Sequence, residues 1–214
     1  MSASRTTPAP PSDGKWISRL NGLVTTILAL GVIGAVLGLV NTAAMALPWP
    51  NAYGFRGLWA PDARVLLDGV VQPGVRQVDA TISLTLNDPE HAPLLAVLQL
   101  FTWVPGTATV LAVLFLLQRI TAAGVAGDRL LFSAETVVRL RRIGTILMIG
   151  SAGAFVLDFA ARTVAAHMLM VHASAVPGMI EPPVLALMMG MGAFVVAEVV
   201  RRGLVMLDEL EGTI

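Results

Sequence analysis

The chain contains no cysteine and little charge. Of its 214 residues, 13% are charged and 56% are hydrophobic, and the formal net charge is zero. A soluble domain has about 25% charged residues and about 45–50% apolar ones. The absence of cysteine excludes disulfides, thiolate metal ligands and a cysteine nucleophile, and the zero net charge gives no indication of nucleic-acid binding. This composition therefore indicates a protein whose solvent is lipid.

The sequence also lacks the short motifs that mark common active sites. It has no Ser-His-Asp pattern, no phosphate-binding glycine loop, no dinucleotide-binding glycine signature and no HExxH zinc motif. We therefore predict no catalytic residue, no cofactor and no metal site, and we interpret the chain as non-enzymatic.

Four apolar runs are each long enough to cross a bilayer, which takes about 20 helical residues. A cleaved signal peptide is the rival interpretation of the first run, but a signal h-region has about 7–15 residues, so the longer run favours an uncleaved span. We predict an all-α membrane protein with four transmembrane helices in an antiparallel bundle. Residues 1–15 are expected to be a disordered cytoplasmic tail, and residues 16–214 the membrane domain. The predicted spans cover residues 21–47, 94–123, 143–166 and 184–207.

Residues 48–93 form the largest polar segment and would be an exterior loop. In residues 78–86, apolar and polar side chains alternate, which is typical of a strand. Residues 64–71 are a second candidate strand, and Gln72-Pro73-Gly74 suits a turn with Pro at i+1 and Gly at i+2. We predict a small extracytoplasmic β-hairpin between the first and second spans.

Pro105 interrupts the second span. A proline inside a helix removes a backbone hydrogen bond and commonly kinks it. Two interpretations stay open: a tolerated kink, or a broken helix that lines a cavity.

A helix-start signal precedes the third span. Ser133 suits an N-cap, and Glu135 in the first turn complements the helix dipole. Glu135, Arg139 and Arg142 follow one helical face at i, i+4 and i+7.

A second charge cluster lies where the fourth span ends, formed by Glu198, Arg201 and Arg202. If the third and fourth spans are antiparallel, both clusters lie at one level of the membrane. We then expect Glu198 to pair with Arg139 or Arg142, and Glu135 with Arg201 or Arg202. Two interpretations stay open: a structural clamp between the helices, or a docking surface for a cytoplasmic partner.

The distribution of basic residues predicts the orientation. Residues 48–93 contain three arginines and five acidic residues. The positive-inside rule therefore puts this segment outside and both termini, with the connector between the second and third spans, in the cytoplasm. The basic residues assigned to the cytoplasmic side are Arg5, Lys15, Arg19, Arg119, Arg129, Arg139, Arg141, Arg142, Arg201 and Arg202.

Asp158 and Arg162 lie four residues apart inside the third span. Ionisable residues at membrane depth favour a functional hypothesis. They form either a self-satisfied ion pair with Arg162 reaching towards the interface, or a proton or cation site.

Histidines are few. His167 and His172 are five residues apart, so they do not share a face of a regular helix, and His91, Glu90 and Glu181 are the nearest candidates to join them. Surface histidines are the favoured interpretation over a metal or pH-sensing site.

The two charged stretches resemble the bacterial membrane family known as domain of unknown function 2975. One stretch reads Gly-Asp-Arg-Leu-Leu-Phe-Ser-Ala-Glu over residues 127–135, then Val-Arg-Leu-Arg-Arg-Ile-Gly over residues 138–144. The other reads Ala-Glu-Val-Val-Arg-Arg-Gly over residues 197–203, followed by an acidic end that closes in Thr213-Ile214. The resemblance implies a small multi-span protein of the bacterial cytoplasmic membrane without an assigned activity. It also implies a regulatory role, since such proteins are thought to be encoded beside small helix-turn-helix regulators.

The first hypothesis is therefore a sensor, scaffold or regulatory membrane component. Its expected partners are the lipid bilayer and a second membrane or cytoplasmic protein, with a second copy of the chain as an alternative partner. The alternative function is a subunit of a small transporter or channel that uses Asp158 and Arg162. A membrane enzyme that uses His167 and His172 ranks third.

Overall fold

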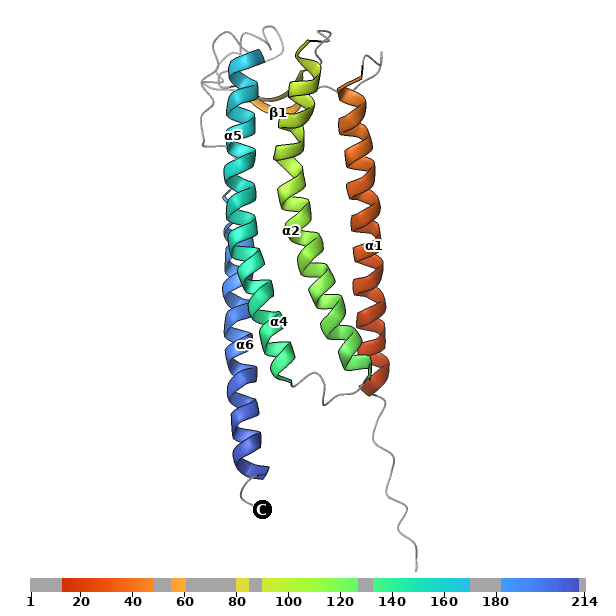
Figure 1. The fold of residues 1–214 in the computed structure, drawn as a ribbon, viewed down its shortest axis with the longest axis vertical. Helices are drawn as coiled ribbons and strands as arrows, with labels where there is room; N and C mark the ends of the chain where they lie inside the picture. The colour runs from red at the N-terminus through yellow and green to blue at the C-terminus, as the bar shows by residue number, and fades with distance from the viewer. Residues whose placement is uncertain are drawn as a thin grey trace, which may run out of the picture.

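The computed structural model of the chain describes residues 13–47, 55–60, 80–84, 90–126, 133–169 and 182–211. Most of them are helical (Figure 1). The helices are α1 (Asp13–Met45), α2 (Ala92–Ala126), α4 (Ala134–Thr145), the π-helix η2 (Ile146–Gly150), α5 (Ser151–Leu169) and α6 (Val184–Glu211). The strands are β1 (Phe55–Ala60) and β2 (Ala80–Leu84).

Within the described ranges, four helices are long and apolar enough to span a membrane, as the sequence predicts. They are Trp16–Met45, Ala92–Val125, Ala134–Leu169 and Val184–Met206. The third combines α4, η2 and α5 in 36 residues, or about 54 Å at 1.5 Å per residue, against about 30 Å for a bilayer core. Its ends therefore extend beyond the hydrocarbon. At the other end of the chain, α1 begins at Asp13, inside the predicted tail, and residues 1–12 lie outside the described ranges.

Neighbouring spans run in opposite directions (Figure 1). α1 packs on α2, α2 packs on α5, and α6 packs mainly on α4 and η2 and hardly on α5. The C-terminal end of α6 extends beyond the lower ends of the other helices in this view. The fourth helix is thus shifted along the bundle axis relative to the third.

Small residues let the helices approach closely. Between α1 and α2, a Cβ on Gly38 would lie 3.0 Å from the Trp103 ring. Between α2 and the third span, a Cβ on Gly150 would lie 2.6 Å from the Thr109 hydroxyl. Glycine or alanine also makes up much of the buried surface, as at Ala165 and Ala197. Large apolar side chains such as Leu185, by contrast, face outward, as expected where the solvent is lipid.

The predicted β-hairpin is not supported. β2 lies within the predicted strand of residues 78–86, but its antiparallel partner is β1, with Phe55 opposite Leu84 and Ala60 opposite Ala80. Residues 64–71 and the Gln72-Pro73-Gly74 turn lie outside the described residues. Alternation identifies a strand but not its partner, which depends on contacts far along the chain.

The second span is a continuous helix. α2 runs through Pro105 without interruption, so the interpretation as a broken helix is wrong. The hydroxyl of Thr109, one turn after Pro105, donates to the Pro105 carbonyl oxygen at 2.8 Å. A π-helical segment, η2, lies in the third span instead, and the Ser151 hydroxyl donates to the Leu147 carbonyl there. No sequence pattern in residues 146–150 predicts this segment.

Candidate functional site: the charge cluster of α4 and α6

α4 begins where the sequence predicts. Ser133 is the N-cap: its backbone is extended, and its hydroxyl accepts a hydrogen bond from the Thr136 N–H at 3.3 Å. Glu135 lies in the first turn, beside the positive end of the helix dipole. This cap fixes the register of α4, and with it the directions of the three arginines that follow.

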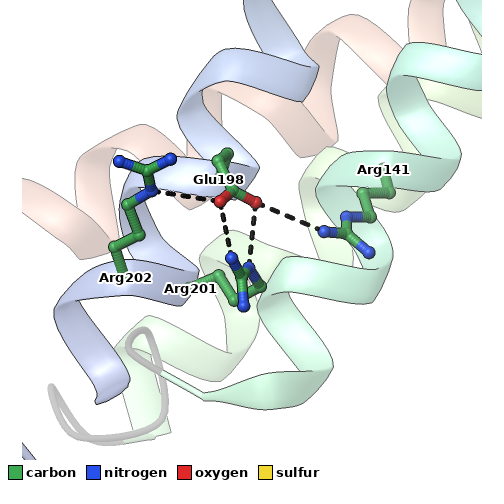
Figure 2. Close-up of polar contacts among 4 residues, drawn as sticks. All are labelled: Arg141, Glu198, Arg201 and Arg202. Atoms are coloured by element: carbon green, nitrogen blue, oxygen red, sulfur yellow. Dashed lines mark hydrogen bonds and ion pairs between the residues drawn. The ribbon is translucent and has the colours of Figure 1, made fainter. Parts of the chain in front are cut away.

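Glu198 on α6 is the centre of the cluster (Figure 2). Its carboxylate accepts from Arg201 through Nε at 2.9 Å and Nη2 at 2.7 Å, and from Arg202 Nε at 3.1 Å. Arg141 on α4 donates from Nη2 at 3.5 Å, so the contact joins the third and fourth spans. The two charged stretches therefore meet, as predicted.

The partners within the cluster differ from those predicted. Glu198 pairs with Arg141 rather than with Arg139 or Arg142, and Glu135 pairs with Arg139 on its own helix rather than with Arg201 or Arg202. The reason lies in helix geometry, because Arg141 is four residues after the buried Val137 and three before the buried Gly144. It therefore flanks the stripe of α4 that faces α6.

Arg139 has a different role. It is two residues, or about 200°, from Arg141 around the helix. Its guanidinium pairs with Glu135 and also donates from Nη1 to the Arg119 carbonyl of α2 at 3.2 Å. The Arg119 guanidinium lies 4.9 Å from the centroid of the Phe115 ring. Arg139 thus links α4 to the end of α2, whereas Arg142 is exposed on α4.

α4 and α6 approach each other closely at two glycines. A Cβ on Gly144 would lie 2.8 Å from the Phe194 ring and 2.9 Å from the Gly190 carbonyl oxygen, so the two backbones are nearly in contact. The Arg141–Glu198 contact is long, and both side chains are partly exposed. Ion pairs of that kind contribute little to stability. We therefore expect the glycine contact to contribute more than the charge cluster to the α4–α6 packing.

No family model, curated protein or solved structure matches the chain. The resemblance to domain of unknown function 2975 stays a prediction.

The second predicted site is a pair within α5. Arg162 Nε donates to Asp158 Oδ1 at 2.7 Å, and the Asp158 side chain is 15% exposed. On the neighbouring helix α2, Oε1 of Gln99 is buried and accepts no hydrogen bond within the part of the chain that the structure describes. Thr109 of α2 and Gly150 of the third span are in contact and so mark a common level. Gln99 is ten residues from Thr109 along α2, and Asp158 is eight residues from Gly150 along the third span, in the same direction along the bundle. At 1.5 Å per residue, Gln99 and Asp158 lie within about 3 Å of the same level.

The histidines do not gather in the described residues. His167 Nδ1 is 2.8 Å from the Thr163 carbonyl oxygen one turn earlier, a distance that fits a hydrogen bond in the tautomer that carries its hydrogen on Nδ1. His172 and Glu181 lie outside the described residues. Within the described ranges, no group of three or more His, Cys, Asp or Glu residues is arranged to hold a metal ion.

Sequence reasoning missed Arg141 as the residue that joins the helices. The prediction grouped charged residues that share one helical face with each other, and it therefore favoured Glu135, Arg139 and Arg142. Spacing from buried residues does not single out Arg141, because Arg139 is similarly spaced from Thr136 and Ile143. What distinguishes Arg141 is its place one turn before Gly144, which contacts α6, and the sequence does not reveal that contact.

Proposed function

We propose that the protein is a non-enzymatic component of the bacterial cytoplasmic membrane that senses, scaffolds or regulates through protein contact at the arginine-rich end of α4 and α6. The observation that carries the proposal is the convergence of Arg141, Arg201 and Arg202 on a single carboxylate while all three side chains stay at least half exposed. Because the glycine contact already holds the helices, these charges are available for another molecule.

Orientation is part of the proposal. Seven of the nine described arginines, all except Arg56 in β1 and Arg162 in α5, lie towards the end of the bundle where α1 begins, α2 ends, α4 begins and α6 ends, which supports a cytoplasmic location for that end and for both termini. These arginines are Arg19, Arg119, Arg139, Arg141, Arg142, Arg201 and Arg202.

Photocrosslinking in living bacteria tests the proposed contact. A photoreactive amino acid at Arg142, which is exposed on α4, is expected to give a protein adduct of one defined mass. Adding Arg141→Glu and Arg202→Glu should abolish this adduct without reducing the amount of protein in the membrane. The same photoreactive residue at Val156, exposed on α5, is the matched control and should give none. No adduct at position 142, or one that survives both charge reversals, contradicts the proposal.

A second candidate function is a subunit of a small transporter or channel. The buried Gln99 oxygen at the level of the Asp158–Arg162 pair favours it, since an amide oxygen without a partner among the described residues and a carboxylate at the same depth of the membrane suit a proton or cation. Proteoliposomes test this function: Asp158→Asn should abolish ion flux while the protein stays folded. Equal flux through the parent and the variant rules out this use of Asp158.

A further inference from the structure

The cluster around Glu198 holds more positive than negative charge. Three guanidinium groups surround one carboxylate, and its two oxygens already accept four hydrogen bonds. A guanidinium has five N–H donors, so most donors of the three arginines are not used by Glu198. Figure 2 shows both terminal nitrogens of Arg202 pointing away from the carboxylate. Glu135 does not balance the excess, because it pairs with Arg139.

The excess positive charge could be balanced by an anion other than Glu198, and the depth of the cluster in the membrane indicates which anion that is. Residues 184–197 of α6 carry no charged side chain before Glu198. They extend about 21 Å, which is shorter than a bilayer core of about 30 Å. The guanidinium groups of Arg201 and Arg202 therefore lie at the depth of the lipid headgroups rather than beyond them, with their stems along the apolar region. At that depth the most abundant anion is a lipid phosphate.

An apolar stripe on α6 leads directly to these arginines. Met188, Met191, Val195 and Val199 recur at helical spacing, and more than half of each is exposed. Gly192 lies beside them, and a Cβ there would have no neighbour within 4 Å. The stripe ends at Arg202, whose side chain is 72% exposed. From Met191 to Arg202 the helix rises about 16 Å, close to the depth of one leaflet, about 15 Å.

We propose that Arg141, Arg201 and Arg202 form a binding site for the phosphate of an anionic phospholipid whose acyl chain lies along the Met188–Val199 stripe. The planar guanidinium fork matches phosphate geometry, so arginine suits this role better than lysine. Glu198 keeps the two arginines of α6 together and directs their remaining donors outward. The site uses the same arginines as the proposed protein contact, but lipid binding needs no protein partner, so the two proposals fail separately.

The test measures lipid binding by the purified full-length chain in neutral detergent, by native mass spectrometry during titration with phosphatidylglycerol or phosphatidylcholine. The parent should bind one phosphatidylglycerol in preference to phosphatidylcholine. Replacing one arginine, Arg202→Gln, should weaken phosphatidylglycerol binding about fivefold, and Arg141→Gln with Arg202→Gln about thirtyfold. Arg19→Gln removes an exposed arginine from the same end of the bundle and is the matched control, with no expected change.

Two further variants separate the parts of the site. Arg202→Lys keeps the charge but loses the fork, so its affinity should fall between those of the parent and Arg202→Gln. Gly192→Phe places a bulky side chain on the open part of the stripe and should weaken phosphatidylglycerol binding without changing any charge. Equal binding of both lipids by the parent, or equal losses in Arg19→Gln and Arg202→Gln, overturns the proposal. Displacement of the lipid by an equimolar amount of inorganic phosphate overturns the role of the stripe.

Discussion

At the scale of single residues, Glu198 and Gly144 contribute to the α4–α6 contact in different ways. Glu198 gathers three arginines, yet its contact with α4 through Arg141 is 3.5 Å long and exposed to solvent or headgroups. Gly144 has no side chain, and for that reason it lets the Phe194 ring and the Gly190 carbonyl approach its backbone. In a membrane, where burial of apolar surface does not drive helices together, such close packing is a main source of attraction.

Removing the Glu198 charge should therefore change stability little. Glu198→Gln keeps the size of the side chain and part of its hydrogen bonding, and exposed ion pairs contribute little. We expect the midpoint of thermal unfolding in detergent to stay close to that of the parent. A large fall in the midpoint would show that the ion pair, and not the glycine contact, clamps the two helices.

Adding one methyl group at Gly144 should have a larger effect. The Cβ of Gly144→Ala would meet the Gly190 carbonyl oxygen at 2.9 Å, and backbone atoms cannot move aside cheaply. Overpacking of this kind costs about 1–3 kcal/mol. Gly153→Ala is the matched control in the same span, because its Cβ would meet nothing within 4 Å. Thermal unfolding should show a clear loss for Gly144→Ala and none for Gly153→Ala; equal midpoints would contradict the packing argument.

At the scale of elements, the irregular turn η2 lies where three helices meet. Gly150 at its end contacts Thr109 of α2, while Met148 within it contacts Gly190 of α6. A π-helical turn changes the direction of the side chains that follow and is often found at functional positions. Here it separates the amphipathic α4 from the apolar α5, so α4 faces α6 while α5 faces α2.

The Gly150–Thr109 contact can be tested by a double-mutant cycle. In Gly150→Ala, the new Cβ would lie 2.6 Å from the Thr109 hydroxyl and 2.8 Å from its methyl group. Its distance from the Thr109 Cβ would be 3.2 Å, which a shift of a few tenths of an ångström relieves. Gly150→Ala alone should cost about 1–3 kcal/mol in unfolding free energy, and adding Thr109→Ala should recover much of it. Strictly additive effects would show that the two residues are not in contact.

At the scale of the whole molecule, the sequence predicted the four spans and the start of α4. Both follow from local signals: long apolar runs and the Ser133 cap. It did not predict that β1 would pair with β2, that Arg141 would reach Glu198, or that η2 would interrupt the third span. The strand pairing and the Arg141–Glu198 contact join residues far apart in the chain, and the second of them follows the contact between Gly144 and Gly190 of α6. Apolar runs reveal the number of helices but not which faces meet.

The orientation of the bundle is the remaining property of the whole molecule, and the absence of cysteine makes it easy to measure. A single cysteine introduced by Ala134→Cys, exposed at the start of α4, or by Glu90→Cys, exposed just before α2, is the only thiol in the chain. A maleimide that cannot cross the membrane should label position 90 in intact cells, and position 134 only after permeabilisation. This follows from the arginines gathered at the α4 end, because translocating that end would carry them across the bilayer. The opposite labelling would put the arginine cluster outside the cell. That result would contradict the proposed contact with a cytoplasmic protein. It would leave open the proposed binding of phosphatidylglycerol, which is measured with the purified protein.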